Sequence, residues 1–398
     1  MKIGVVGLGK AGLPLACTIA DSGLDVIGVD INRNLINKLS KKENPIPEER
    51  DVQEILKKTI GKNFNLSSDP IETAMKCNVH IVIVPLFIDN NKNPDFSLLN
   101  QAFTNVAKGL NKGDCVILET TVPPGTTEHI VREWLEKESN LKAGKDFHLA
   151  YSPERIMTGY SISRYKEFPK VIAGLTSKCT ETAYNVYSRF CSKVDKASSI
   201  KTAEFVKVAE GVYRDVNIGL ANELFKIAEK MEIDFWEVRE KAKHAYCNIL
   251  EPGIVGGHCI PVYPWFLINN EMLDTTLIKT ARILSDNMAK YYADKVDRIA
   301  KRGGKVAVVG LSYREGVKED AYSGSYLMIE ELRKRGYKVY GIDPLFEADE
   351  VEKRFRIDSC TKQQLENMDA VVLMNKIKEY KFSKIAKKVV DVKNVLRG

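Results

Sequence analysis

The chain opens with MKIGVVGLGKAGLPLACTIADSGLDVIGVDINR, residues 1–33, and this stretch decides the fold of its first part. An apolar run at residues 2–6 ends in glycines, an amphipathic helical pattern follows to about Ser22, and a second apolar run at residues 26–29 ends at Asp30. Short apolar runs bounded by turn residues indicate buried strands, whereas apolar residues spaced three to four apart indicate a helix. The order strand, helix, strand predicts a βαβ unit with parallel strands.

Within this unit, Gly7-Leu8-Gly9-Lys10-Ala11-Gly12 matches the pattern G-x-G-x-x-G. In that pattern the first glycine allows a tight turn, the second lets the backbone approach a pyrophosphate, and the third lets helix and strand pack closely. The helix N-terminus behind the loop favours phosphate groups. Asp30 at the end of the next strand would accept hydrogen bonds from ribose hydroxyls, which favours NAD over NADP. The alternative is a turn that uses its glycines for geometry alone.

Further strand-like runs follow the first unit, with helical segments between most of them: His80–Pro85, Cys115–Glu119, His148–Ser152 and Val171–Ala173. This alternation predicts a parallel sheet with helices on both faces. From about Lys201 the pattern becomes one long helix, interrupted by Gly211 and Gly219. Each glycine costs about 1 kcal/mol in a helix interior. We therefore expect a close packing contact or a bend at those positions.

Helical patterns continue at Trp236–Ala245 and Leu277–Lys301, and a strand pattern returns at Lys305 with KVAVVGLSYREG, YKVYGIDP, DAVVLM and KVVDVKNVL. We predict an α/β protein in which two Rossmann-like doubly wound domains are joined by a mostly α-helical central domain with a long core helix. The predicted boundaries are 1–198 for an NAD-binding domain, 199–301 for the central domain, and 302–398 for the second α/β domain.

Composition excludes several classes of protein. The 398 residues carry a net charge of +7, but the lysines are spread along the chain and form no arm of the kind that binds nucleic acid. The excess charge either steers an anionic ligand weakly or only solubilises the surface. Eight cysteines form no C-x-x-C pair and no zinc-like spacing, so we expect no metal. No signal peptide and no membrane-spanning run are evident, and we expect a cytoplasmic protein with reduced thiols.

Cys259 stands out in EPGIVGGHCIPVYPWF, residues 251–266, where three glycines precede it. A cysteine thiolate can attack an aldehyde and hold it covalently. The alternative is a cysteine that is simply buried, as we expect for the other seven. His258 could promote ionisation of the thiol, although neighbouring side chains in a loop often point apart.

Two other strand ends carry candidate residues. ETTVPPGTTEHI, residues 119–130, places Thr121 where ligands meet a parallel sheet, while Thr126 and Thr127 could equally cap the following helix. YSPERIMTG, residues 151–159, places Glu154 and Arg155 beside a proline turn, where they could serve a ligand or form a surface ion pair.

Three positions of the long helix share one face: Lys207, Gly211 and Arg214. A lysine, a bare backbone and an arginine stacked along a helix could bind an anionic ligand. The alternative is an ordinary solvated helix face.

Taken in order, these motifs resemble the UDP-sugar 6-dehydrogenase family over essentially the whole chain. The matching pieces are GLGKAGLP, VIGVD, ETTVPPGT, YSPER, AEFVKVAEGVYRDVNIGLANEL, KHAYCNILEPGIVGGHCIP, TARILSDNM, VAVVGLSYR and YGIDP. The ordered set is highly specific, although no single piece is. The form GGHC, with KH and NIL-x-PG before it, is similar to the UDP-N-acetylhexosamine branch and above all to UDP-N-acetylmannosamine dehydrogenases.

The resemblance implies that the C6 alcohol of a UDP-sugar is oxidised twice, with two NAD⁺, to a uronate for a surface polysaccharide or glycan. Cys259 would add to the intermediate aldehyde as a thiohemiacetal, which is oxidised to a thioester that water hydrolyses. Lys207 would stabilise oxyanion charge, and Glu154 would position or deprotonate the water. The resemblance also implies a homodimer or higher homo-oligomer centred on the long helix.

The resemblance carries over two sets of binding residues. The implied NAD-binding residues are Gly7, Gly9, Lys10, Ala11, Gly12, Asp30, Arg33, Leu86 and Thr121. The implied substrate-binding residues are Arg155, Ile156, Arg214, His244, Gly256, Tyr313, Arg314 and Lys393, of which the last three would reach the uridine diphosphate.

The sequence departs from the family pattern at five positions. Tyr263 replaces the usual aspartate four residues after the nucleophile, Gly211 replaces an asparagine, Leu86 a threonine, and Tyr322 and Tyr246 replace arginines. Other hypotheses about function therefore stay open: a UDP-glucose or UDP-N-acetylglucosamine dehydrogenase, a small β-hydroxyacid dehydrogenase, or a sugar-nucleotide-binding relative with impaired turnover. The small-acid enzymes lack the second α/β domain, and a binding module would not need Cys259 and Lys207.

Overall fold

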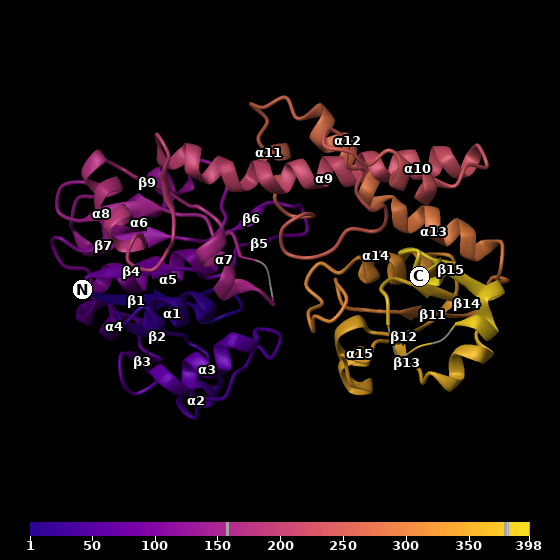
Figure 1. Cartoon of the computed structure of the whole chain (residues 1–398), viewed down its shortest axis with the longest axis horizontal. Coiled ribbons are helices and arrows are strands. Elements are labelled where there is room, and N and C mark those ends of the chain that lie inside the picture. The colour runs from indigo at the N-terminus through magenta and orange to yellow at the C-terminus, as the bar shows by residue number, and fades with distance from the viewer. Residues whose placement is uncertain (157–158, 378–379, 381, 398) are drawn as a thin grey trace. The chain divides into compact units, whose positions relative to one another are not determined.

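The computed structural model describes residues 1–156, 159–377, 380 and 382–397 (Figure 1). Met157 and Thr158 of the YSPERIMTG stretch lie outside the described residues. The chain forms two compact units, Met1–Ala209 and Glu210–Gly398, and the division falls within helix α9 (Ile200–Lys230).

The first unit is built on an eight-stranded sheet flanked by helices (Figure 1). Its strands are β1 (Lys2–Val6), β2 (Asp25–Val29), β3 (Phe64–Ser67), β4 (Val79–Val82), β7 (Cys115–Leu118), β8 (His148–Tyr151), β9 (Lys170–Gly174) and β10 (Val194–Lys196), and β5 (Phe87–Ile88) and β6 (Pro94–Asp95) form a separate hairpin. Its helices are α1 (Gly12–Asp21), α2 (Arg33–Ser40), α3 (Arg50–Thr59), α4 (Pro70–Lys76), α5 (Ser97–Lys108), α6 (Arg132–Ser139), α7 (Ser161–Glu167) and α8 (Ser177–Tyr187), with a π-helical turn at Thr127–Val131. The strand order is β10-β9-β8-β7-β4-β1-β2-β3.

Alternate residues of the central strands supply two buried clusters, one on each face of this sheet. In β1, Ile3 and Val5 pack in a cluster with α1, α3, α7 and α8, whereas Val6 packs in a cluster with α5 and α6. A strand buried on both faces is apolar at every position, which is why these strands appear as continuous apolar runs in the sequence. The predicted βαβ arrangement with helices on both faces is confirmed.

One strand pair differs from the predicted parallel sheet. β9 runs antiparallel to β8, with Ala150 opposite Gly174. In its described residues the segment between them holds the short helix α7, and it is anchored to the buried carboxylate of Glu49, which accepts hydrogen bonds from the backbone of Gly159 and from Ser161. Parallel pairing needs a crossover that recrosses the sheet, and this segment makes none.

The second unit contains a helical part and a five-stranded parallel sheet. Its helices are the remainder of α9, α10 (Phe235–Lys241), α11 (Trp265–Ile268), α12 (Thr276–Asp286), α13 (Met288–Asp297), α14 (Gly324–Lys334) and α15 (Ala348–Phe355), with 3-10 turns at Gln363–Asn367, Ser383–Lys388 and Val395–Arg397. Its strands are β11 (Lys305–Val309), β12 (Lys338–Ile342), β13 (Asp358–Ser359), β14 (Ala370–Leu373) and β15 (Val389–Asp391), in the order β13-β12-β11-β14-β15.

Two predicted helices of this unit are shorter than their patterns. The first ends at Lys241 because His244 and Cys247 exchange backbone hydrogen bonds of 3.0 Å and turn the chain. The second is divided into α12 and α13 at Asn287, whose ψ of −5° departs from the helical value.

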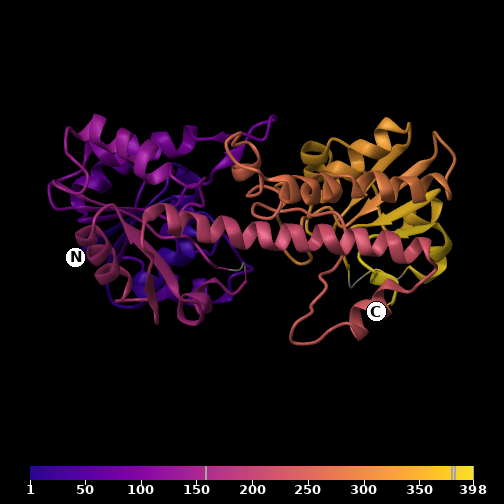
Figure 2. The same cartoon turned by 90° about the horizontal axis from the view of Figure 1, so that it is seen from above.

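Helix α9 is continuous, as Figures 1 and 2 show, and its buried side carries small and polar residues. The buried positions at three- to four-residue spacing are Glu204, Lys207, Gly211, Asp215, Gly219 and Asn222. A Cβ at Gly219 would lie 2.9 Å from the Cβ of Ala281 in α12, so this glycine permits close helix packing. The expected close contact is therefore present, and the helix does not break to accommodate it.

Glu204 ties α9 to the turn after the second proline of the PPGTT sequence. Its carboxylate accepts hydrogen bonds from the backbone N–H of Gly125 and from both the N–H (2.8 Å) and the hydroxyl (2.7 Å) of Thr127. The hydroxyl of Thr126 instead donates to the carbonyl of Pro123 at 2.6 Å. Neither threonine hydroxyl caps the helix, so the capping alternative is wrong for both.

Glu204 predicts a specific dependence of stability on pH. Burial raises the pKa of Glu204 from 4.5 to about 7 although its hydrogen-bond donors favour the ionised form. Its contribution to the free energy of unfolding is therefore complete below about pH 4.5 and is lost as the pH rises through 7, a change on the order of 3 kcal/mol. Denaturant unfolding of the full chain between pH 4.5 and 8 should show this loss, and Glu204→Gln should remove it. Parallel pH profiles for the two chains would contradict the assignment.

Candidate active site

The topology of the first sheet has a switch point beside β1. From β1 the chain builds outward to β2 and β3 and then returns to β4 on the other side of β1. Ligands of open α/β sheets bind at such a switch point, outside the carboxyl ends of the strands. The glycine loop, residues 7–12, follows β1, and residues 83–86 follow β4.

The three glycines of this loop have different surroundings. Gly7 has a φ of +96°, and a Cβ on it would lie 2.8 Å from the carbonyl oxygen of Ile83. A Cβ on Gly12 would lie 1.9 Å from the carbonyl oxygen of Gly7. Gly9 is exposed, and a Cβ there would meet nothing within 4 Å. Internal packing thus explains Gly7 and Gly12, whereas Gly9 faces open space, as expected for a residue that a pyrophosphate approaches.

Asp30 is held beside the same loop by two backbone amides. One carboxylate oxygen accepts from the N–H of Leu8 and the other from the N–H of Asn32, both at 2.9 Å. This fixed carboxylate at the end of β2 suits a ribose diol. Lys10 lies 3.2 Å from the carboxylate of Glu48, and Ala11 precedes α1 in a half-buried position.

The remaining predicted NAD contacts occupy different environments. Arg33 is exposed at the start of α2. Leu86 after β4 is half-buried against the apolar cluster that contains Val6 and residues of α5 and α6. Thr121 after β7 is buried. Thr120 donates its hydroxyl hydrogen bond to the carbonyl of Val84 and so joins the loops that follow these two neighbouring strands.

The loop after β8 brings Glu154 to Lys207. The Glu154 carboxylate lies 4.0 Å from the ammonium of Lys207, which is only 6% exposed, and it also accepts a hydrogen bond from the backbone N–H of Ile156. The alternative of a solvated helix face is therefore wrong for Lys207. Arg155 is half-buried and donates to the carbonyl of Pro169 at 2.9 Å.

Sequence reasoning missed a second buried ion pair next to this loop. Glu119, directly after β7, pairs with Lys170 and accepts the hydroxyl of Tyr187 at 2.9 Å. Burial raises the pKa of Glu119, and the Lys170 ammonium opposes that shift. The carbonyl of Glu119 accepts from the N–H of Glu154 at 3.2 Å, so this pair helps to fix the loop. The only signal in the sequence was an acid placed at a strand end.

In the second unit, the glycines before Cys259 are packed against protein. A Cβ on Gly256 would lie 2.9 Å from the backbone nitrogen of Gly324, and one on Gly257 would lie 2.8 Å from the ring of Tyr313. A Cβ on Gly253 would lie 3.1 Å from the ammonium of Lys393. The cysteine loop therefore rests directly on the segments predicted to bind the uridine diphosphate.

Cys259 itself is half-buried. The hydroxyl of Tyr263 lies 3.3 Å from its sulfur in hydrogen-bonding geometry. Six of the other cysteines are buried as predicted, but the prediction is wrong for Cys247, which is half-buried in the turn after α10. That turn pairs the backbone of Cys247 with His244 and leaves this segment partly open to solvent.

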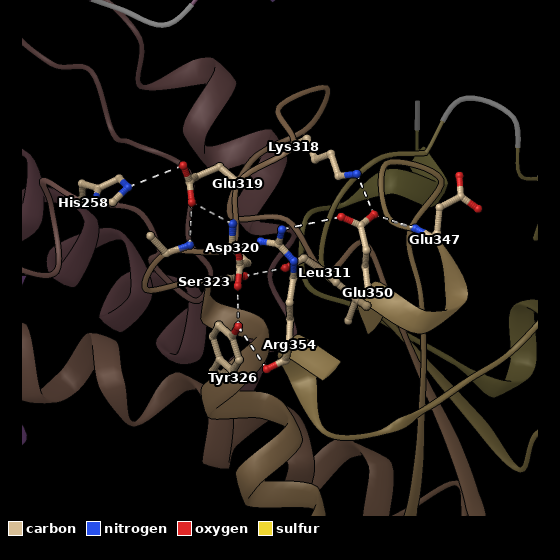
Figure 3. A network of polar contacts seen from close by, with 11 residues as sticks. His258, Leu311, Lys318, Glu319, Asp320, Ser323, Tyr326, Glu347, Glu350 and Arg354 are labelled. Atoms are coloured by element: carbon tan, nitrogen blue, oxygen red, sulfur yellow. Dashed lines mark hydrogen bonds and ion pairs between the residues drawn. The ribbon is translucent and has the colours of Figure 1, made fainter. Parts of the chain in front are cut away.

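His258 is directed toward Glu319, at 3.7 Å (Figure 3). The other carboxylate oxygen of Glu319 accepts from the N–H groups of Asp320 and Ala321, each at 3.1 Å. The carboxylate of Asp320 in turn bonds Arg354 at 2.8 Å and Tyr326 at 2.6 Å. This network joins the cysteine loop to the loop after β11 and to α14 and α15.

The other predicted substrate residues of this unit differ in their exposure. Arg214 and His244 are exposed, and the guanidinium of Arg314 lies 5.9 Å from the ring centre of Tyr313. Burial lowers the pKa of the Lys393 ammonium, and the charge of Glu251 opposes that shift. A half-buried lysine beside a glycine is suited to bind a phosphate, whose negative charge favours the ionised ammonium.

Within the described parts of the chain, no helix is long and apolar enough to cross a membrane. No group of three or more His, Cys, Asp or Glu side chains in those parts could hold a metal ion.

These features define a class: a two-unit α/β oxidoreductase with a dinucleotide loop and a solvent-accessible cysteine. Sequence comparison identifies the family. Residues 1–191, 201–286 and 307–398 match the NAD binding, central and UDP binding domains of the UDP-glucose/GDP-mannose dehydrogenase family. The chain belongs to this family and is an NAD-dependent UDP-sugar dehydrogenase, as its motifs predicted.

Named relatives are similar over almost the whole chain. A UDP-N-acetyl-D-mannosamine dehydrogenase of Methanocaldococcus jannaschii is 35% identical, with 99% of this chain and 92% of the relative covered. One of Campylobacter jejuni is 32% identical, with coverages of 95% and 96%. The solved UDP-N-acetylmannosamine dehydrogenase of Pyrococcus horikoshii superposes with a TM-score of 0.88 at 30% identity, covering 99% and 96% of the two chains.

The glycine loop allows a test that separates binding from folding. Gly9→Ala should leave the melting temperature unchanged, because its Cβ enters open space, but should weaken NAD⁺ binding about tenfold or more by obstructing the pyrophosphate. Gly12→Ala should lower the free energy of unfolding by about 1–3 kcal/mol, because its Cβ meets backbone. Calorimetric titration and thermal unfolding measure both quantities. Unchanged NAD⁺ affinity in Gly9→Ala would refute the placement of the pyrophosphate.

Proposed function

We propose that the enzyme oxidises C6 of a UDP-N-acetylhexosamine, foremost UDP-N-acetyl-D-mannosamine, to the uronate. The names of the relatives support this substrate, since several at 32–35% identity over most of the chain are UDP-N-acetyl-D-mannosamine dehydrogenases. One relative is an NDP-N-acetyl-D-galactosaminuronic acid dehydrogenase, which supports the N-acetyl group more strongly than the epimer. The GGHC form of the cysteine loop supports the same branch.

The half-buried thiol of Cys259 is the observation that carries this proposal. Its loop packs against Tyr313 and the segment at residues 322–324 of the same unit, where the family places its UDP-binding domain. A loop that rests on the nucleotide-binding segments can present sulfur to the sugar of the same nucleotide. Bound NAD⁺ supplies the hydride acceptor for both oxidations.

The chain's own residues would carry the covalent part of the reaction. The Cys259 thiolate adds to the C6 aldehyde, so that a sulfur–carbon bond forms and the carbonyl electron pair moves to oxygen, which gives a thiohemiacetal. Loss of hydride from that carbon leaves a thioester. Water then adds to the thioester and the thiolate leaves, which yields the uronate.

Lys207 and Glu154 have proposed roles in the same chemistry. Lys207 would stabilise oxyanion charge, and Glu154 would position or deprotonate the hydrolytic water. The first unit supports these roles, because Lys207 is buried with Glu154 as a carboxylate partner at 4.0 Å. In the family pattern, the aspartate that Tyr263 replaces is the usual partner of Lys207. Glu154 supplies a counter-charge to Lys207 instead, which favours an active enzyme over an impaired relative.

The binding residues and the wider setting remain part of the proposal. We assign NAD contacts to Gly7, Gly9, Lys10, Ala11, Gly12, Asp30, Arg33, Leu86 and Thr121, and sugar-nucleotide contacts to Arg155, Ile156, Arg214, His244, Gly256, Tyr313, Arg314 and Lys393. The proposed domain division is 1–198, 199–301 and 302–398. The proposed location is the cytoplasm, and the proposed use of the product is polysaccharide synthesis.

We also propose a homodimer through the second unit. Three exposed apolar residues recur every seventh position on α9: Tyr213 (68% exposed), Leu220 (51%) and Ile227 (48%). Leu277 and Ile283 of α12 are exposed as well, at 69% and 45%. An apolar stripe of this kind on two helices is typical of a surface that a second copy covers.

The substrate proposal predicts the outcome of a panel assay. The chain is incubated with NAD⁺ and UDP-N-acetylmannosamine, UDP-N-acetylglucosamine, UDP-N-acetylgalactosamine or UDP-glucose, and NADH and product mass are followed together. UDP-N-acetylmannosamine should give the highest kcat/KM and two NADH per uronate. A higher kcat/KM for UDP-glucose would assign the enzyme to the other branch.

A cysteine exchange tests the covalent route in the same assay. Cys259→Ser should release almost no uronate, because no thioester can form. Cys247→Ser is the matched control, since Cys247 is also half-buried, and it should keep wild-type turnover. Normal uronate release by Cys259→Ser would refute the covalent mechanism.

The dimer proposal predicts the effect of one charge. Leu220→Glu places a carboxylate within the apolar stripe and should shift the mass measured by light scattering from two chains to one at micromolar concentration. Met75→Glu, at a 60% exposed position of the first unit, should leave the mass unchanged. A wild-type chain of monomer mass would overturn the proposal.

A further inference from the structure

Cys259 and Tyr263 stand on the same side of one turn. The backbone N–H of Tyr263 donates to the carbonyl of Cys259 at 2.9 Å, and this turn leads into α11. Residues four apart on a helical turn are side-chain neighbours. The hydroxyl of Tyr263 accordingly lies 3.3 Å from the Cys259 sulfur.

The tyrosine ring is held in place on two sides. Gly211 of α9 lies against it, such that a Cβ on this glycine would fall 2.6 Å from Cδ2 and 3.3 Å from Cβ of Tyr263. The ring of Phe266 lies with its centre 5.7 Å away. Tyr263 is only 8% exposed, so its hydroxyl has one defined position relative to the sulfur.

Gly211 destabilises the interior of α9, and its contact with Tyr263 explains why a glycine is present. Glycine in a helix interior is less favourable than alanine by about 1 kcal/mol. Any side chain at position 211 would occupy space that the Tyr263 ring now fills, because separations below 3.0 Å are not tolerated without movement. The glycine and the tyrosine therefore form a pair, and the position of the hydroxyl depends on the glycine.

We propose that Tyr263 is a positioning residue that donates a hydrogen bond to the Cys259 thiolate, and that Gly211 is present to admit its ring. This inference rests on the proposed role of Cys259 as the nucleophile. A hydrogen bond to an anion is stronger than one to its neutral form, so the hydroxyl raises the fraction of thiolate and fixes the direction of its attack. When the thiolate bonds to an aldehyde carbon, the carbonyl oxygen takes a proton from solvent, and the tyrosine keeps its own.

The test measures the thiol itself. Cys259 of the full chain is alkylated with iodoacetamide between pH 5 and 10, and its labelling is followed by the mass of its peptide. Tyr263→Phe removes only the hydroxyl. It should slow labelling about tenfold near neutral pH and move the midpoint of the pH profile upward by about one unit, since one charge-assisted hydrogen bond is lost.

Matched variants separate this effect from general damage. Tyr160→Phe, at a 60% exposed tyrosine, should leave the profile unchanged. Gly211→Ala should move the profile in the same direction as Tyr263→Phe, and adding it to Tyr263→Phe should change little, because both remove one interaction. If Gly211→Ala does not fold, the comparison of Tyr263→Phe with Tyr160→Phe decides alone.

An unshifted pH profile in Tyr263→Phe would overturn the inference. If Gly211→Ala added to Tyr263→Phe shifted the profile again by the same amount, the proposed pairing of Gly211 with Tyr263 would be overturned. Alkylation requires no sugar nucleotide, so its result is independent of the substrate panel. A chain that turns over none of the UDP-sugars but shows the shift loses the proposed function and keeps this inference. Normal turnover of a UDP-sugar with an unshifted profile would keep the proposed function and overturn this inference.

Discussion

The buried side of α9 is the constraint on which the other features depend. Each of its polar side chains contacts another segment of its own unit. In the first unit Glu204 holds the turn after Pro124, and Lys207 meets Glu154. In the second unit Asp215 pairs with Arg282, and Asn222 exchanges two hydrogen bonds with the backbone of Gly253 at 2.7 and 3.2 Å. A buried row of this composition contributes little apolar burial, so its value lies in placing loops that carry function.

The sequence predicted the parts of the fold that local patterns determine. Strands buried on both faces are continuous apolar runs, and the glycine loop has a fixed geometry, so the first βαβ unit and the start of the second sheet were found near their observed bounds. Short edge strands were missed, among them β3 and β10, because three or four half-polar residues give no period. The strand β9 was predicted at Val171–Ala173, but its antiparallel direction was missed, since that direction depends on the anchor that Glu49 provides across 110 residues of sequence.

In the candidate site, too, local patterns predicted some residues, and contacts between distant parts of the sequence were missed. Asp30, Lys207 and Cys259 could be proposed as site residues because each stands at a position that a motif or a helix face specifies. The buried contacts of Glu204 and Asn222 were not predicted, because Thr127 lies 77 residues from Glu204 and Gly253 lies 31 residues from Asn222. The local sequence shows which side chain is present, but only the tertiary fold shows which group that side chain contacts. Polar residues with helical spacing on one side of α9 were a signal that sequence reasoning interpreted as possible ligand contacts.

Two of the departures from the family pattern, Gly211 and Tyr263, are interpreted differently once their packing is known. Taken separately, Gly211 and Tyr263 are two losses, an amide and a carboxylate, that argue for weaker catalysis. Together they occupy one volume, because the ring fills the space that a side chain at 211 would need. A change that removes a side chain from a helix interior is destabilising unless something replaces the lost contacts, and here an aromatic ring does so. The same ring carries a hydroxyl to the sulfur of Cys259, so the residue that removes a carboxylate from the family pattern places another polar group beside the thiol. Selection for impaired function would not require the two positions to fit each other. Their fit therefore indicates an altered but working environment for the thiol.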